Sequence, residues 1–300
     1  MTADPWAVVA AAMGRASVQI RPLETLDEMT VACRLLDDVW EIPAGGASDV
    51  RPSLLRALGH AGNYLAGAYA SGGPRAGEMV AASVAFFGAP PGQSLHSHIT
   101  GVLPRSGRGI GGAVKWHQRA WALDRGLRRI TWTYDPLIAR NAFFNVTRLG
   151  ALPERYLVDF YGPMDDGPNR GQPTDRADVG WDLRSDPTER AAAAVLDPAA
   201  ATDGPDIGAL RAAGAVVALS VGSSGEPVTE LGTGGRPAGG HVLIGLPADI
   251  EALRRSDQAG ALRWRLALRA VLGPLLGDDR WRVGGFAKSG WYVLDRKGRE

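Results

Sequence analysis

Residues 96–120, HSHITGVLPRSGRGIGGAVKWHQRA, constrain the fold of this chain more than any other stretch. A strand-like segment ends at Pro104, a glycine-rich loop follows, and a helical pattern begins near Gly112. The N–H groups at the start of a helix point toward a ligand, and the helix dipole favours negative charge there. Glycines let a phosphate approach the backbone without an intervening Cβ atom. The stretch therefore indicates an anion-binding loop, unless its glycines only allow the chain to turn.

The elements predicted around this loop follow the order β-α-α-β-β-β-α-β-α-β-β over residues 15–185. This order predicts a mixed α/β sheet. After Asp186 the composition shifts to an Ala-rich segment and a Gly-rich stretch at 222–240. One long helical pattern, residues 248–276, and several strand patterns follow. We therefore expect two domains, 15–185 and an additional C-terminal α+β unit, 186–300.

The charge balance and the cysteine content exclude several classes of protein. The formal net charge is +1, which argues against a nucleic-acid partner bound through a basic face. Cys33 is the only cysteine, so a cysteine-based metal site is excluded, and the five histidines show no H-E-x-x-H spacing. The N-terminal segment lacks a basic region before its short apolar run, and no stretch is long enough to span a membrane. We expect a cytoplasmic protein with no metal and no membrane partner.

The glycine loop also matches a dinucleotide-binding fingerprint. Gly107, Gly109 and Gly112 form a G-x-G-x-x-G, and Asp135 ends the next strand about twenty residues later. An NAD(P)-binding oxidoreductase is therefore one alternative. Against it, residues 104–106 separate the strand from the glycines, and the loop does not lie in a repeated βαβ array. A Walker A loop is excluded because no Gly-Lys-Ser/Thr follows.

The element order, the segment Val102-Leu103-Pro104 and the loop SGRGIGG resemble the GCN5-related N-acetyltransferase (GNAT) superfamily. The pyrophosphate-binding signature of that family is Arg/Gln-x-x-Gly-x-Gly/Ala. Gly109 and Gly111 match its two small positions, and Ser106 stands where Arg or Gln is usual. The segment RLGA, residues 148–151, resembles the Lys-Leu-Gly-Phe that ends a helix in the family. The C-terminal region resembles a bacterial subgroup of two-part acetyltransferase-like proteins.

The resemblance implies acetyl-CoA or another acyl-CoA as the cosubstrate. Its pyrophosphate would lie on the backbone N–H groups of the glycine loop. Its pantetheine arm would lie along the fourth strand, where a backbone N–H would hold the thioester oxygen. Asn141 resembles an asparagine that contacts pantetheine in the family, and Arg140 is a candidate contact for the adenosine phosphates. The candidate binding residues are Ile99, Gly101, Val102, Leu103, Ser106, Gly107, Arg108, Gly109, Ile110, Gly111, Gly112, Arg140 and Asn141.

The implied reaction is direct attack of an amine on the thioester in a ternary complex. The chain would thus be an N-acyltransferase acting on a primary amine of a small molecule. His96 and His98 are candidates for the base because they lie two apart on a strand, share a face and titrate near neutral pH. His98 is closer to the segment that would hold the thioester. A water relay that needs neither histidine is the alternative.

The departing thiolate receives a proton from a tyrosine in many members of the family, and the corresponding residue here is Val146. Tyr134, Tyr156 and Tyr161 are replacement candidates, although aromatic residues on strands are commonly part of the core. Two functions stay open: an enzyme with another proton donor, or a non-catalytic acyl-CoA-binding protein with this fold.

The acceptor site is indicated only by acidic residues that could attract a cationic amine: Asp135, Asp159, Asp165 and Asp166. Arg263, Arg265 and Arg269 lie close together on the C-terminal helical pattern, where they form either a solvated face or part of a site. The C-terminal region itself has two candidate roles, which are to cover the acceptor cleft or to form a homodimer interface.

Overall fold

The structure is a computed structural model, and it describes residues 3–42, 46, 50–162, 171–230 and 239–298. The chain divides into two compact units. Unit 1 comprises Met1–Trp132 and Asp182–Ala201, and unit 2 comprises Thr133–Trp181 and Thr202–Glu300. The compact units do not coincide with the predicted domains 15–185 and 186–300, because a central segment of the chain packs with the C-terminal region in unit 2.

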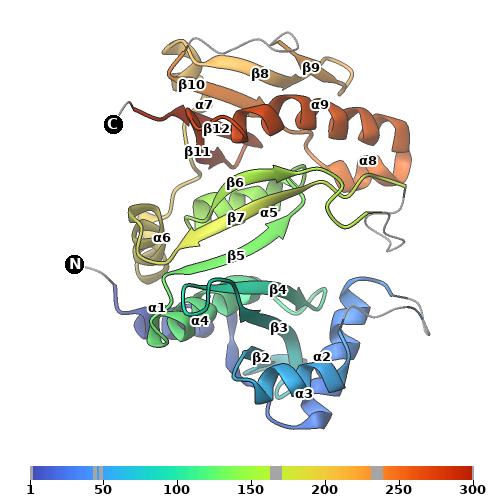
Figure 1. Ribbon diagram of the computed structural model, residues 1–300, viewed down its shortest axis with the longest axis vertical. Coiled ribbons are helices and arrows are strands. Elements are labelled where there is room, and N and C mark those ends of the chain that lie inside the picture. Colours follow the sequence, from blue (N-terminus) through green and yellow to red (C-terminus); the bar gives the residue numbers. More distant parts are fainter. Residues whose placement is uncertain (1–2, 43–45, 47–49, 163–170, 231–238, 299–300) are drawn as a thin grey trace. The chain divides into compact units, whose positions relative to one another are not determined.

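Unit 1 contains a mixed sheet whose strands pair in the order β1-β2-β3-β4-β5 (Figure 1). The first three pairs are antiparallel and the pair β4–β5 is parallel. The elements that begin in this unit are α1 (Pro5–Ala16), β1 (Val18–Pro22), α2 (Leu26–Val39), α3 (Pro52–His60), β2 (Tyr64–Ala70), η1 (Gly73–Arg75), β3 (Met79–Phe87), β4 (Ser94–Val102), α4 (Ile110–Asp124), β5 (Arg129–Tyr134), α6 (Asp186–Leu196) and η3 (Pro198–Ala200).

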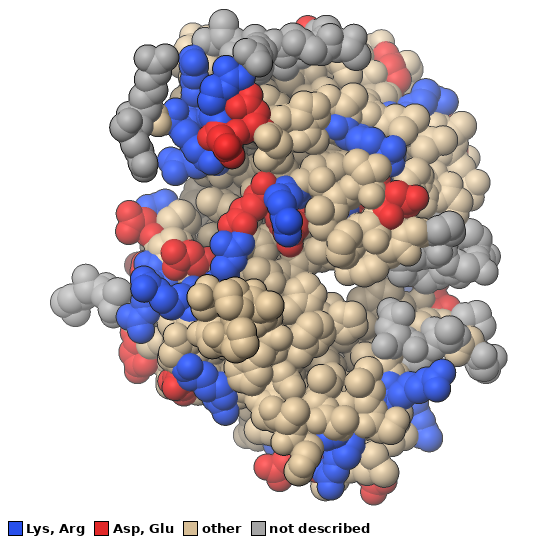
Figure 2. Space-filling view, viewed as in Figure 1, with Lys and Arg blue, Asp and Glu red and all other residues tan. Residues whose placement is uncertain are grey.

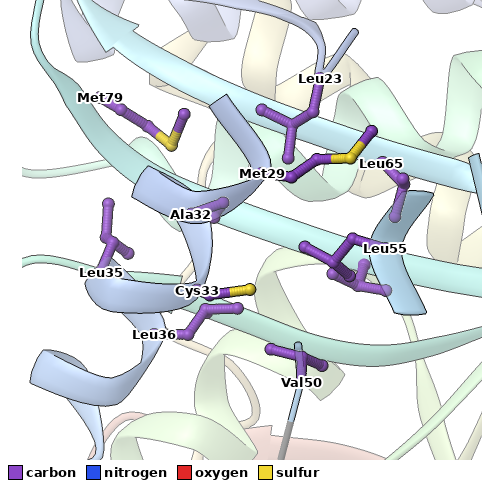
Figure 3. Packing of buried hydrophobic residues seen from close by; sticks show 12 residues of the cluster. Leu23, Met29, Ala32, Cys33, Leu35, Leu36, Val50, Leu55, Leu65 and Met79 are labelled. Carbon is purple, nitrogen blue, oxygen red and sulfur yellow. The ribbon is translucent and has the colours of Figure 1, made fainter. Parts of the chain in front are cut away.

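Helix α2 packs its apolar face on the sheet together with α3. A capping box starts α2: the Thr25 hydroxyl accepts a hydrogen bond from the Glu28 N–H, and the Glu28 carboxylate accepts one from the Thr25 N–H. Cys33 of α2, Leu55 of α3 and Leu65 of β2 belong to one buried cluster (Figure 3). Cys33 is thus a core residue, and burial raises the pKa of its thiol to about 11.

Helix α1 was not predicted. Asp4 caps it by accepting a hydrogen bond from the Trp6 N–H, and Pro5 occupies the first helical position. The apolar face of α1 joins a second buried cluster that includes the first turns of α4, with Ala16 on one helix and Ile110 on the other. The N-terminal end of α4 is therefore supported by α1 as well as by the sheet.

Unit 2 contains the antiparallel pair β6–β7 and a five-stranded sheet in the order β11-β12-β10-β8-β9. In this second sheet β10 pairs parallel with β8, and the other pairs are antiparallel. The elements of this unit are α5 (Ala139–Phe143), η2 (Phe144–Arg148), β6 (Leu152–Leu157), β7 (Arg176–Asp182), α7 (Ile207–Ala212), β8 (Val216–Val221), β9 (Pro227–Thr229), β10 (His241–Gly245), α8 (Ile250–Ser256), α9 (Gln258–Leu276), β11 (Trp281–Ala287) and β12 (Trp291–Arg296).

The predicted α/β class, the element order over residues 15–185 and the additional C-terminal α+β unit are confirmed. The predicted single helix over 248–276 is wrong, because the chain breaks at Asp257 into α8 and α9. The Asp257 carboxylate accepts a hydrogen bond from the Gly260 N–H at 2.8 Å, which caps the new helix.

Charged side chains of both signs are interspersed on the face shown in Figure 2, in line with the near-zero net charge. None of the described helices is long and apolar enough to cross a membrane.

Candidate functional site

The glycine loop forms a turn rich in left-handed backbone immediately before α4. Arg105, Gly107 and Gly109 have φ angles of 62°, 116° and 84°, a region that glycine enters at little cost. Gly109 is the N-cap of α4, and its carbonyl accepts the Ala113 N–H at 2.9 Å. The exposed loop therefore leads directly into the first turn of α4.

The first-turn N–H groups of Ile110, Gly111 and Gly112 have no acceptor within the described residues. Such groups carry the positive end of the helix dipole and suit an anion. Arg108, one residue before the N-cap, adds an exposed positive charge. We refer to residues 107–112 as the anion cradle.

Ser106 stands at the entrance of the anion cradle. Its Oγ atom is buried, and no side chain or backbone group in the described part of the chain bonds to it. A buried hydroxyl without a partner costs free energy, which a bound acceptor would recover. A Cβ atom on Gly111 would lie 3.8 Å from the Val102 side chain, an ordinary van der Waals distance, so the protein itself does not crowd this space. Both observations fit a phosphate-bearing ligand.

Strand β4, which precedes the cradle, is paired unequally with its two neighbours. Its antiparallel pairing with β3 runs from Leu95 to Val102. Its parallel pairing with β5 covers only Ser94–His96, opposite Arg129–Thr131. Among the described residues of unit 1 the two parallel strands thus part after His96, and we call this the β4–β5 split. An extended ligand can add to the edge of a strand that has parted from its neighbour.

A β-bulge lies in β4 just beyond the start of the split. Val84 faces Ile99 and Ala85 faces Ser97, so His98 is the extra residue of the bulged strand. A bulge interrupts the hydrogen-bond ladder and re-aims neighbouring side chains, and bulges are frequent beside active sites. The bulge places one of the two candidate bases at the irregular part of the strand.

His96 and His98 lie on the same side of the sheet, as their spacing predicts. Both rings contact Phe86 of β3, with centroid distances of 5.2 Å and 5.7 Å, and the two imidazoles are 6.4 Å apart. His96 is half-buried, and its Nδ1 atom lies 3.1 Å from the Thr131 Oγ1 atom. His98 is exposed. Of the two, His98 is the more accessible to a substrate.

The apolar side chains of the predicted thioester segment, residues 99–103, pack in the hydrophobic core. Ile99 and Leu103 pack against the α2 cluster, and Val102 packs against the cluster of α1 and α4. A Cβ atom on Gly101 would lie 2.8 Å from Leu36, so only glycine allows this close approach of β4 to α2. Their side chains therefore leave only the backbone to contact a ligand, and the binding role expected for these residues stays a prediction.

Lys115 is the buried group that sequence reasoning missed. Its side chain projects from α4 toward the sheet and is only 6% exposed. Its Nζ atom donates to the Ser97 Oγ atom at 2.8 Å and lies 3.9 Å from the centre of the Trp132 ring. Burial lowers the pKa of this amine to about 7. The signal in the sequence was that only three lysines occur in the chain.

A cavity of about 1010 Å³ opens at the paired ends of β4 and β5. Phe86, His96 and Thr131 line it, and Asp182 contributes a carboxylate. All of its lining residues belong to unit 1. The cavity therefore reaches His96 of β4, two residues before the bulge at His98.

The predicted site residues of unit 2 are engaged in other contacts. The Tyr134 hydroxyl is buried 2.9 Å from the Tyr292 hydroxyl, and burial raises the pKa of Tyr134. Arg140 is bonded to Glu251 of α8, with one N–O distance of 2.9 Å. Asn141 is half-buried in α5. The contacts of Tyr134 favour a structural role, and the roles predicted for Arg140 and Asn141 stay predictions.

The alternative tyrosines have different surroundings. Tyr156 donates to the Asp175 carboxylate at 2.7 Å, and burial together with that carboxylate raises its pKa. Tyr161 is exposed, with its hydroxyl 3.0 Å from the Thr133 Oγ1 atom. Val146 is buried. Asp159 is bonded to the Thr174 N–H at 3.0 Å, and Asp165 and Asp166 lie outside the described residues.

Asp135 is a buried structural acid. Although burial favours its protonated form, Arg265 and Arg254 bind the carboxylate and hold its pKa well below its usual range. Arg265 is 1% exposed and Arg269 pairs with Asp175 at 2.8 Å, whereas Arg263 is 60% exposed, so the three predicted arginines do not form one solvated face. An acid paired in this way is unsuited to binding a ribose or an acceptor amine. The antiparallel β3–β4 pair beside the glycine loop also differs from the parallel array of a dinucleotide fold.

The described residues contain no group of three or more His, Cys, Asp or Glu side chains that could hold a metal ion.

No family model and no curated protein matches this chain. Solved structures to which it is similar include several acetyltransferases. The ribosomal-protein-S18-alanine N-acetyltransferase from Escherichia coli is 14% identical, with a TM-score of 0.43 over 56% of this chain and 95% of the other. Aminoglycoside 6'-acetyltransferase type Ii is 13% identical, with a TM-score of 0.43 over 56% and 98%. An N-acetyltransferase from Staphylococcus aureus Mu50 is 13% identical, with a TM-score of 0.43 over 56% of this chain and 99% of the other.

Proposed function

We propose that this chain is an acyl-CoA-dependent N-acyltransferase that transfers an acyl group to a primary amine of a small molecule. The observation that carries the proposal is the order of features along one strand. The β4–β5 split, the bulge at His98 and the anion cradle follow one another from Ser97 to Gly112. An acyl-CoA is an extended thioester with a pyrophosphate, and this order matches its parts.

The anion cradle would hold the pyrophosphate on the N–H groups of Ile110, Gly111 and Gly112, with Arg108 nearby. The edge of β4 would pair with the pantetheine arm, because that arm carries amides that can bond to a strand. A backbone N–H near Ile99 would hold the thioester oxygen and stabilise the negative charge that develops there during attack.

His98 would accept the proton of the attacking amine. The amine nitrogen forms a bond to the carbonyl carbon, the carbon–sulfur bond breaks, and the thiolate leaves and takes up a proton from water. An exposed imidazole on the strand that holds the thioester suits the base. The cavity lined by His96 and Phe86 would admit the acceptor, since the Phe86 ring also contacts His98.

A second candidate is a protein that binds acyl-CoA without turnover. Val146 and the enclosed Tyr134 hydroxyl favour it, because a valine has no proton to donate and the Tyr134 hydroxyl is buried against Tyr292. The two candidates share the binding site and differ only in the chemistry.

Calorimetric titration of the full chain with acetyl-CoA, CoA, NAD and NADP tests the proposal. We expect the CoA compounds to bind and the dinucleotides not to bind. Binding of NAD without binding of CoA would overturn both candidates. Release of free thiol from acyl-CoA in the presence of a panel of primary amines then separates the enzyme from the non-catalytic binder.

A further inference from the structure

The amine of Lys115 is buried without a countercharge. No carboxylate forms an ion pair with it within the described part of the chain, and burial alone lowers its pKa. Burying an unpaired ammonium is costly, and an apolar side chain of similar length would fill the same space without that cost. The neighbouring titratable groups of α4 have their own partners: His117 bonds Tyr64, and Arg119 pairs with Glu189.

The amine also occupies a particular place in the sheet. Ser97 is the first residue of β4 beyond its last pair with β5, and Trp132 is the first residue of β5 beyond the same pair. The Lys115 Nζ atom contacts both, at 2.8 Å from the Ser97 Oγ atom and 3.9 Å from the Trp132 ring centre. Lys115 therefore closes the narrow end of the β4–β5 split on the side of α4.

A ligand that follows β4 has a defined direction. Its phosphates would lie at the anion cradle, beyond the C-terminal end of the strand, and its thioester would lie near the bulge at His98. The strand rises about 3.3 Å per residue, so the five steps from His98 to Leu103 span roughly 16 Å. The acyl group continues away from the phosphates. The next residue in that direction is Ser97, whose Oγ atom accepts a hydrogen bond from the Lys115 amine.

We propose that Lys115 recognises a carboxylate at the far end of the acyl group, so that the preferred donor is a dicarboxylic acyl-CoA thioester. This inference rests on the proposed function and specifies its donor. A carboxylate placed at the narrow end of the split would supply the missing countercharge. Ion pairs of this kind are strongest where water is excluded.

Calorimetry on the full chain tests the inference with acetyl-CoA, malonyl-CoA, succinyl-CoA and glutaryl-CoA. We expect at least one dicarboxylic thioester to bind about ten-fold or more tightly than acetyl-CoA, the order expected for one desolvated charge pair. Lys115→Met should remove this preference. Lys288→Met is the matched control, because Lys288 is exposed and pairs only with Asp203 among the described residues.

Proton uptake provides a readout that does not depend on turnover. At pH 8 the Lys115 amine is largely neutral, since burial lowers its pKa to about 7. Binding of a carboxylate should therefore draw up to one proton per site from solution, measured by titration in two buffers with different ionisation enthalpies. Acetyl-CoA should draw none, and Lys115→Met should abolish the uptake.

The outcomes separate this inference from the function on which it rests. If acetyl-CoA binds as tightly as every dicarboxylic thioester, or if the preference persists in Lys115→Met, the role of Lys115 is refuted while acyl-CoA binding stands. If neither CoA nor any thioester binds, the proposed function fails as well. Thermal unfolding checks that Lys115→Met is folded, and if it is not, the preference and proton uptake of the unaltered chain decide.

Discussion

Arg265 holds Asp135 in a bidentate ion pair inside unit 2, with Nη1–Oδ1 and Nη2–Oδ2 distances of 2.8 Å and 2.7 Å. Arg254 binds the same carboxylate. All three charged side chains are less than one tenth exposed. The pair joins the end of β5 to the middle of α9, two segments 130 residues apart. It is therefore a tertiary contact that helps to hold unit 2 together.

Asp135→Asn should destabilise the protein by about 3–5 kcal/mol, because it leaves two buried guanidinium groups without their countercharge. Asp203→Asn is the control: that carboxylate forms an exposed pair with Lys288, so its loss should cost less than about 1 kcal/mol. Urea unfolding followed by circular dichroism measures both. Equal effects of the two substitutions would show that the buried pair contributes no more than the exposed one.

Gly109→Ala should weaken acetyl-CoA binding by about ten-fold or more. The φ angle of 84° at Gly109 disfavours a residue with a Cβ atom, so the turn that presents the first-turn N–H groups would shift. Gly62→Ala imposes a similar penalty, at a φ of 80° and in open space at the end of α3, and should leave the affinity unchanged. Calorimetry distinguishes the two, and unaltered binding by Gly109→Ala would remove the cradle from the proposed site.

His98→Ala should lower kcat by about 100-fold or more while leaving the affinity for acetyl-CoA within about two-fold, as expected for a general base. His96→Ala should have a smaller effect, since His96 is half-buried whereas His98 is exposed. His60→Ala, an exposed histidine on α3, is the surface control. Steady-state kinetics and calorimetry measure both quantities. Full activity of His98→Ala would favour a water relay.

Stability should fall as the pH drops from about 6.5 toward 4 because of His117. Burial lowers the pKa of this imidazole to about 4, and Tyr64 bonds its Nδ1 atom at 2.9 Å. Between these two pH values the unfolded chain binds a proton that the folded chain does not, so the contribution is complete above pH 6.5 and lost as the pH falls. The loss amounts to about 3 kcal/mol at most.

His117→Asn should reduce this pH dependence, because an amide does not titrate. The difference in unfolding free energy between pH 7.5 and pH 4.5, compared between the two proteins, isolates the contribution of His117 from that of other groups. An unchanged difference would mean that the imidazole is already protonated in the folded state.

The elements around the glycine loop could be predicted because their signals are local. The alternation of His96 and His98, the stop at Pro104 and the glycines that follow act through the chain within a few residues, and the structure agrees with each. The Thr25 cap of α2 is likewise a local signal. At Asp257, however, the local helical pattern gave a wrong prediction of one continuous helix. There the helical period continues, but the carboxylate caps a new helix.

Other parts depended on residues that meet only after folding. A lysine in a helix suggests solvent, yet Lys115 lies under β4 because the sheet covers that side of α4. In the sequence, Arg265 fits a solvated face or a site, and Asp135 is a candidate for the acceptor site, yet the two are buried as a pair. No glycine next to His98 indicates a bulge in the sequence. The bulge results from the register of β4 with β3, which the local sequence does not show.

The amino-acid sequence by itself determined the order of elements over residues 15–185 and the loop geometry that glycine permits before α4, since these depend on backbone preferences within a short stretch of chain. Only the tertiary structure decided which charges are buried and where β4 and β5 part. Those outcomes depend on desolvation and on strand register, and both are set by residues that are distant in the sequence and adjacent in the fold.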